Sequence, residues 1–201
     1  VIRDAAGYAV TPGVLAKTAR LRCGESGSTL RFLLPVLCAA GIEAEIYMEG
    51  RLPARPLSPL REELAAHGAA LSPGGETPLR VSGRIASGAY RLPGNVSSQF
   101  ISGLLFALPL LDGESTLQLT SPPESSGYIE MTERVLDRFG IAMRKEANAY
   151  AIPGGQRYRS PGRAKAEGDW SNAAFWLCAG AVGRGPVTVA GLDMGSAQWD
   201  R

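Results

Sequence analysis

The chain has 201 residues, 45% of them hydrophobic, and a formal net charge of +2. This length and composition allow a buried core in one large or two small domains. The small charge gives no reason to expect nucleic acid as a partner, although clustered arginines would still attract small anions. The three cysteines, Cys23, Cys38 and Cys178, lie far apart, offer no metal spacing and fit a reduced cytoplasmic protein.

The chain has a single histidine, His67, which argues against a histidine metal site and against Ser-His-Asp catalysis. It ends an amphipathic run before Gly68, where a structural role is expected. No signal peptide is visible, and no apolar run reaches the ~20 residues of a membrane span. The closest stretch, residues 100–111, is short and broken by Pro109. We therefore expect a cytoplasmic protein without a membrane partner.

A serine-rich segment at residues 25–29 opens the first predicted helix, which is apolar and runs to about Ala40. Gly41 follows, and glycine is the usual residue just after a helix. Residues 42–48 alternate as a strand does, and residues 56–67 form an amphipathic helix. The apolar side of that helix carries three leucines, Leu57, Leu60 and Leu64.

The same order of elements follows a second time. Residues 97–111 predict a helix buried on all sides, and residues 116–120 predict a strand. An amphipathic helix then begins at about Tyr128 and stops at Gly140. Three of its apolar residues are expected to point inward: Val135, Leu136 and Phe139.

A third copy of the pattern is incomplete. Residues 145–168 contain a strand at 149–152 and then a predicted crossing between domains. A helix begins at Asp169 and runs to about Val182, and a strand is expected at residues 187–190. The chain then ends, so it is interpreted as a truncated portion of a longer protein.

Serine-rich helix starts are the most informative repeated motif, at residues 25–29, 94–99 and 167–172. Thr29 and Ser98 are 69 residues apart, and Ser98 and Ser171 are 73 apart. This period is too long for a solenoid and indicates βαβ-type units in pseudo-symmetric α/β domains, with helices inside. A helix start has unpaired N–H groups and the positive end of the helix dipole, so several starts at one cleft would bind a phosphorylated ligand.

Two arginines, Arg51 and Arg55, follow a predicted strand in a loop stiffened by Pro53 and Pro56. A guanidinium group suits phosphate and carboxylate, whereas the alternative is a solvated loop with two surface arginines. Gly27 allows either close approach of a ligand to the backbone or a left-handed turn, and the sequence does not separate these.

Ser97 has two interpretations, as the N-cap of a helix or as a ligand contact. Ser98 and Gln99 add further polar groups to an otherwise apolar helix, and buried polar groups need partners. Tyr128 fits a core position. Arg31 lies one turn inside an apolar helix, so it is expected to pair with a carboxylate or to face a cleft.

Five segments of the chain form a recognisable series: ESGSTLRFLLP, GRLPARPL, GNVSSQFISGLLFALPLL, SSGYIEMT and EGDWSNAAFWLCAG. In this order they resemble the 5-enolpyruvylshikimate-3-phosphate synthase family over essentially the whole chain. The resemblance implies enolpyruvyl transfer from phosphoenolpyruvate to the 5-hydroxyl of shikimate 3-phosphate, with release of phosphate and without a metal or organic cofactor. It implies an inside-out α/β barrel of βαβαββ units, in two domains that close on the substrates.

The resemblance also implies contacts to shikimate 3-phosphate. The hydroxyls of Ser97, Ser98 and Ser125 look like the donors that hold its phosphate. Gln99 looks like the residue between the two substrates, and Tyr128 looks like a wall of the shikimate site.

Contacts to phosphoenolpyruvate are implied in the same way. Gly27 resembles the glycine whose backbone approaches the phosphate, where glyphosate competes, and Arg55 resembles the arginine that clamps it. Arg31 and Arg51 match supporting arginines, and Asp169 matches an acidic position near the domain crossing.

Other parts of the family pattern are missing from the chain. These are an early Lys-Ser segment, a catalytic Asp, a Lys-Glu pair and further Arg and Lys ligands. Residues 1–160 therefore resemble the shikimate-3-phosphate-binding domain with an incomplete first unit, and residues 161–201 resemble the opening of the second domain. The chain alone is expected to be inactive, and the parent protein is expected to be monomeric. Trp199 is a departure, because the family usually has Gly there.

Three alternatives differ in what they require of the sequence. The related transferase of a UDP-aminosugar shares the fold, but it lacks the Ser-Ser-Gln start and commonly has a Cys before its Arg-Pro, whereas residues 51–54 contain none. A non-catalytic module that binds a phosphate ligand would use the same helix starts. A purely structural repeat would not gather Arg and Ser at those starts.

Overall fold

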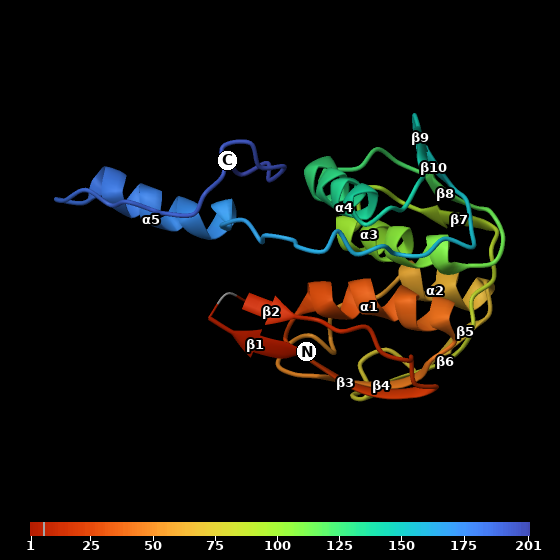
Figure 1. Cartoon of the computed structure of the whole chain (residues 1–201). Helices are drawn as coiled ribbons and strands as arrows, with labels where there is room; N and C mark the ends of the chain where they lie inside the picture. Colours follow the sequence, from red (N-terminus) through yellow and green to blue (C-terminus); the bar gives the residue numbers. More distant parts are fainter. Residues whose placement is uncertain (6) are drawn as a thin grey trace.

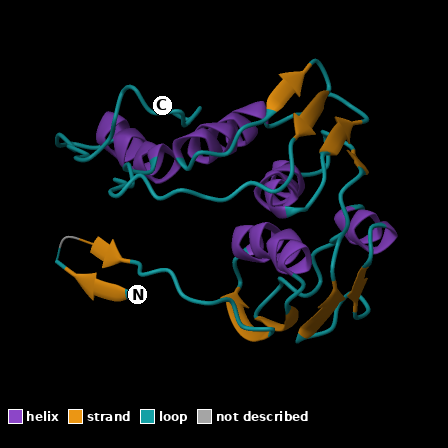
Figure 2. Cartoon of the chain, turned by 45° about the vertical axis from the view of Figure 1, so that its right-hand side comes forward, coloured by secondary structure: helices purple, strands orange, loops and turns teal. Residues whose placement is uncertain are grey.

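The computed structural model describes residues 1–5 and 7–201. Two four-stranded sheets form the outer layers of its main body, and helices fill the space between them (Figure 1 and Figure 2). The strand orders are β3-β4-β6-β5 in one sheet and β7-β8-β10-β9 in the other. In each sheet the first two strands are parallel and the other two join antiparallel. The chain therefore contains two βαβαββ units of one topology, as its repeat predicts.

The elements of the first unit are β3 (Thr18–Gly24), α1 (Gly27–Ala40), β4 (Glu43–Met48), α2 (Leu60–Ala66), β5 (Ala69–Leu71) and β6 (Leu79–Gly83). The second unit has β7 (Ala89–Leu92), α3 (Ser98–Ala107), the 3-10 helix η1 (Leu108–Leu110), β8 (Ser115–Leu119), α4 (Ser126–Arg138), β9 (Arg144–Glu146) and β10 (Ala149–Ile152). A hairpin of β1 (Ile2–Asp4) and β2 (Gly7–Ala9) precedes them, and α5 (Trp170–Val182) follows.

Helix α1 shows how local sequence sets the boundaries of an element. The Ser26 side chain accepts a hydrogen bond from the Thr29 N–H and caps the first turn. Gly41 ends the helix in the left-handed conformation, with φ of 63°. The following strand, β4, alternates between more exposed and buried residues because one face of its sheet packs on the helices.

The contact between α1 and α3 forms the centre of the molecule (Figure 1). A methyl group on Gly103 would lie 2.3 Å from the Arg31 carbonyl oxygen, so only glycine allows the two helices to approach this closely. Leucines of both helices fill the surrounding core, including Leu30, Leu34 and Leu104. The two units therefore share one hydrophobic core.

Three expectations about the elements are wrong. Helix α2 begins at Leu60 and not at residue 56, because Pro59 has no N–H and restricts the residue before it. Val135 on α4 is 48% exposed and does not point inward. No strand forms at residues 187–190, because within the described chain no neighbouring strand pairs with them.

Helix α5 differs from α1 and α3 in its packing. Several of its apolar residues are exposed, including Phe175, Trp176 and Val182, whereas most apolar residues of α1 and α3 are buried. In the part of the chain that the structure describes, no helix is both long enough and apolar enough to span a bilayer.

Replacement of Gly103 tests the close contact of α1 and α3. Gly103→Ala should lower the free energy of unfolding by about 1–3 kcal/mol, because the added methyl group overpacks the core. Urea denaturation measures this change. Gly13→Ala is the control, because no atom lies within 4 Å of its added methyl group. Equal stability of the two variants would show that the helices are not in backbone contact.

Thiol labelling tests the burial of the core. Burial raises the pKa of the Cys38 thiol to about 12 and also raises the pKa of Cys23, so neither thiolate is populated at pH 8. Cys178 is exposed. Maleimide labelling of the native protein, read by mass spectrometry, should therefore modify Cys178 alone, and labelling in denaturant should modify all three. Rapid native labelling of Cys38 would contradict this packing.

Candidate functional site

The candidate site lies where the two units meet. Strands β3 and β4 are parallel, so the α1 start and the loop that contains Arg55 follow the same edge of their sheet. Strands β7 and β8 repeat this arrangement with the starts of α3 and α4. Because α1 packs against α3, residues from the two units come together at the helix starts.

Gly27, the first residue of α1, is the meeting point. A methyl group on Gly27 would lie 3.0 Å from Arg55 Nη1, 3.4 Å from Arg31 Nη1 and 3.8 Å from Gln99 Oε1. Gly27 does not have a positive φ, so a left-handed turn is not the reason for glycine here. A side chain here would instead crowd the ends of the two arginine side chains.

Arg31 connects the two units. Its Nη1 donates a hydrogen bond of 2.7 Å to Gln99 Oε1, and its guanidinium carbon lies 5.2 Å from the Phe100 ring centroid. Of the two alternatives for Arg31, a carboxylate partner is not found: among the described residues, neither Arg31 nor Arg55 has a carboxylate within ion-pair distance. Burial, and secondarily the positive charge of Arg55, lowers the pKa of Arg31. The buried Nε of Arg31 also has no hydrogen-bond partner there.

The two loop arginines have different positions. Two turn hydrogen bonds fold the loop: Leu52 N donates to Glu49 O, and Arg55 N donates to Leu52 O. The Leu52 side chain is buried and anchors the loop. Arg55 consequently reaches Gly27, whereas Arg51 is exposed and its side chain has no partner in the described chain.

The start of α3 is open to a ligand. Ser97 occupies the N-cap position but makes no side-chain capping bond, and the hydroxyl of Ser98 has no partner among the described residues. Ser121 Oγ accepts from the Gly94 N–H at 3.0 Å and donates to Asn95 Oδ1 at 2.9 Å, which fixes the preceding loop. Two hydroxyls are therefore held at a helix start without an internal function.

The start of α4 is open in the same way. Ser125 is its N-cap residue and makes no side-chain capping bond. Tyr128 is 53% exposed, so the core role considered for it is wrong. In contrast, the α1 start is capped by Ser26, and the α5 start is capped by Asp169, which accepts from the Ser171 N–H at 2.9 Å.

Asp169 is therefore a helix cap, and it also lines a cavity between α4 and the C-terminal segment. Hydrogen bonds, chiefly from the Asn172 side chain, lower the pKa of Asp169. This cavity has a volume of about 300 Å³, and its lining residues are Gly127, Tyr128, Met131, Asp169, Ser171, Gln198, Trp199 and Asp200.

Trp199 has a structural role that the sequence did not reveal. A methyl group on Gly127 would lie 2.3 Å from the Trp199 ring, so the indole packs directly on the first turn of α4. Trp199 Nε1 donates to Glu130 Oε2 at 3.4 Å. Within the described chain this is the single hydrogen bond between residues 168–201 and residues 1–152. An exposed tryptophan among polar residues was the available signal.

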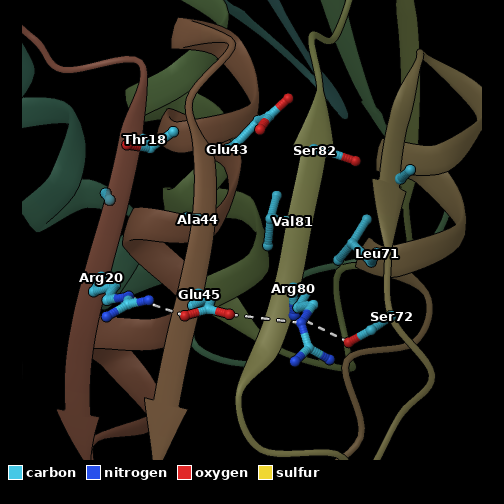
Figure 3. Close-up of a pocket in the computed structure, with 12 residues that line it drawn as sticks. Thr18, Arg20, Glu43, Ala44, Glu45, Leu71, Ser72, Arg80, Val81 and Ser82 are labelled. Carbon is cyan, nitrogen blue, oxygen red and sulfur yellow. Dashed lines mark hydrogen bonds and ion pairs between the residues drawn. The ribbon is translucent and has the colours of Figure 1, made fainter.

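Another cavity, of about 850 Å³, lies on the first sheet, and Figure 3 shows its lining residues. There Arg20 and Arg80 flank Glu45, at 3.2 and 3.6 Å from its carboxylate oxygens. Both of these arginines have a carboxylate partner, whereas Arg31 and Arg55 have none among the described residues.

Known proteins resemble this chain in sequence over most of its length. A family model described as EPSP synthase (3-phosphoshikimate 1-carboxyvinyltransferase) matches residues 5–201. The 3-phosphoshikimate 1-carboxyvinyltransferase of Clostridium kluyveri is 41% identical over 187 residues, which cover 92% of this chain and 43% of that protein. The protein of the same name from Idiomarina loihiensis is 41% identical over 190 residues, which cover 90% of this chain and 44% of that protein. The chain thus spans less than half the length of these relatives.

Solved structures share the fold. An EPSP synthase from Acinetobacter baumannii has a TM-score of 0.66 at 24% identity, covering 86% of this chain and 39% of that chain. A second structure of EPSP synthase from the same organism has a TM-score of 0.59 at 26% identity, covering 69% of this chain and 31% of that chain. The expected α/β fold with inward helices is confirmed. With a family model that matches nearly its whole length and relatives at 41% identity, the chain belongs to the EPSP synthase (3-phosphoshikimate 1-carboxyvinyltransferase) family.

Proposed function

We propose that this chain supplies substrate contacts for enolpyruvyl transfer from phosphoenolpyruvate to the 5-hydroxyl of shikimate 3-phosphate. The observation that carries the proposal is the convergence of Arg31, Arg55 and Gln99 on Gly27 without a neutralising carboxylate. Two guanidinium groups without a carboxylate partner at a helix start favour a ligand with phosphate and carboxylate groups. Family membership supports the same reaction.

In this proposal the phosphate of phosphoenolpyruvate lies against Gly27. Arg55 binds this phosphate by charge-assisted hydrogen bonds, and the missing side chain of Gly27 lets the phosphate approach the backbone. Arg31 supports the site by holding Gln99, which lies between the two units and would contact both substrates. Arg51 adds positive charge at the rim. Glyphosate would compete for the same position.

Shikimate 3-phosphate is proposed to bind at the starts of α3 and α4. Ser97, Ser98 and Ser125 would donate hydrogen bonds to its phosphate, because their hydroxyls make no bond to described residues. Tyr128, which is half exposed, would form a wall beside the ring. Binding of both anions at the seam, where α1 and α3 join the two units, would align the 5-hydroxyl with the enolpyruvyl carbon.

The remaining parts of the reaction are proposed to come from outside this chain. The acid and base groups would belong to the further length of the relatives, which the chain does not span. Residues 1–160 would form the shikimate-3-phosphate-binding domain and residues 161–201 the opening of the second domain, with Asp169 in a supporting position. The parent protein would act as a cytoplasmic monomer.

Ligand titration of a serine variant tests the proposed phosphate site. Ser98→Ala should weaken shikimate 3-phosphate binding about 10- to 100-fold, because a hydrogen bond to a charged group contributes about 1.5–3 kcal/mol. Isothermal titration calorimetry measures this, with Ser82→Ala on the first sheet as the control. UDP-N-acetylglucosamine should not bind. Binding of that nucleotide instead, or equal affinities of both variants, would contradict the proposal.

Turnover by the chain alone is a separate test. The 201-residue protein should release no phosphate from phosphoenolpyruvate and shikimate 3-phosphate above the uncatalysed rate, because it is proposed to lack the acid and base groups. A colorimetric phosphate assay measures this. Clear, enzyme-dependent phosphate release would show that the chain contains the full catalytic set.

A further inference from the structure

Glu25 lies next to the site and belongs to neither proposed substrate contact set. It precedes the Ser26 cap of α1, and its Oε1 accepts a hydrogen bond of 2.9 Å from the Arg51 backbone N–H. A methyl group on Gly50 would lie 2.5 Å from Glu25 Cδ and Oε1. Gly50 has a φ of +56°, so its conformation and its missing side chain both accommodate the carboxylate.

This contact ties the arginine loop to the start of α1. A second bond, from the Glu49 N–H to the Gly24 carbonyl at 2.8 Å, joins the same two segments two residues before Arg51 and one residue before Glu25. Beyond Arg51, two turn bonds carry the loop to Arg55, whose guanidinium group lies against Gly27. The Glu25 bond is therefore the last of these hydrogen bonds to the segment before α1 as the loop continues to Arg55.

The Glu25 carboxylate accepts a hydrogen bond from a backbone N–H and does not pair with an arginine side chain. Glu25 lines a cavity of about 500 Å³ together with Arg51 and Arg55. Nevertheless, in the described part of the chain, Glu25 forms no ion pair within 4 Å of either guanidinium group. A carboxylate that accepts a backbone N–H fixes the loop while Arg55 remains available to an anion.

We propose that Glu25 is a positioning residue that places Arg55 beside Gly27 by holding the Arg51 backbone. The inference rests on the proposed function, because Arg55 is proposed to bind the phosphate of phosphoenolpyruvate. Glu25 itself does not touch the ligand. Its effect requires a hydrogen-bond acceptor at this point and does not require a negative charge.

Three variants separate these properties. Glu25→Ala removes the acceptor, and Glu25→Gln keeps an acceptor without the charge. Glu49→Ala is the control, because it removes an exposed neighbouring carboxylate that has no side-chain partner among the described residues. Hydrogen exchange of the Arg51 amide in the free protein is the first measurement. Exchange should become about tenfold faster in Glu25→Ala and stay near the wild-type rate in the other two variants. Unchanged exchange in Glu25→Ala would overturn the proposal.

Phosphoenolpyruvate titration in the presence of shikimate 3-phosphate is the second measurement. Glu25→Ala should bind phosphoenolpyruvate about tenfold more weakly, with shikimate 3-phosphate affinity unchanged, and Glu25→Gln should restore the affinity. Equal losses for both ligands, or no rescue by Gln, would overturn the positioning role. If wild-type protein binds neither ligand, the proposed function fails, whereas the exchange measurement still decides whether Glu25 holds the loop.

Discussion

The backbone contact between α1 and α3 at Gly103 is the constraint on which the site depends. It joins two units that have their own sheets and sets the distance between their helix starts. The Arg31–Gln99 hydrogen bond crosses this seam and joins residues 68 positions apart in the chain. Neither unit alone contains the arrangement around Gly27, because Gln99 comes from one unit and both arginines come from the other. The packing of apolar helices and the assembly of a polar site are therefore one structural event.

Charge and capping distinguish the seam from the rest of the surface. On the first sheet, Glu45 lies between two arginines, and near the C-terminal end of the chain Asp169 caps the start of α5. At the seam, Arg31 and Arg55 have no such carboxylate in the described chain, and the starts of α3 and α4 are uncapped. An uncapped start costs about 0.5–2 kcal/mol of stability. These unsatisfied groups occur together, at the place where family membership leads us to propose substrate binding.

The repeat made the architecture predictable, because apolar periodicity and glycine stops report local structure directly. Both βαβαββ units follow from it, whereas the roles that the family motifs assign to Gly27, Arg55 and the serines stay predictions. Other features depend on neighbours that a sequence does not display. The strand expected at residues 187–190 lacks a pairing strand, and the packing of Trp199 on Gly127 depends on how a distant segment returns to α4. The acceptor role of Glu25 was equally invisible, because its partner is a backbone N–H 26 residues away.

The uncapped start of α3 also has a thermodynamic consequence. Ser97 and Ser98 leave polar groups that water satisfies in the free protein and that an anion would satisfy better. Repulsion between Arg31 and Arg55 acts in the same direction, because it is relieved when negative charge enters the seam. Folding and occupancy are therefore linked equilibria: a ligand present at 100 times its dissociation constant would add about 2.7 kcal/mol to stability. Under the proposed function, the supply of anionic substrate would become part of what holds the two units together.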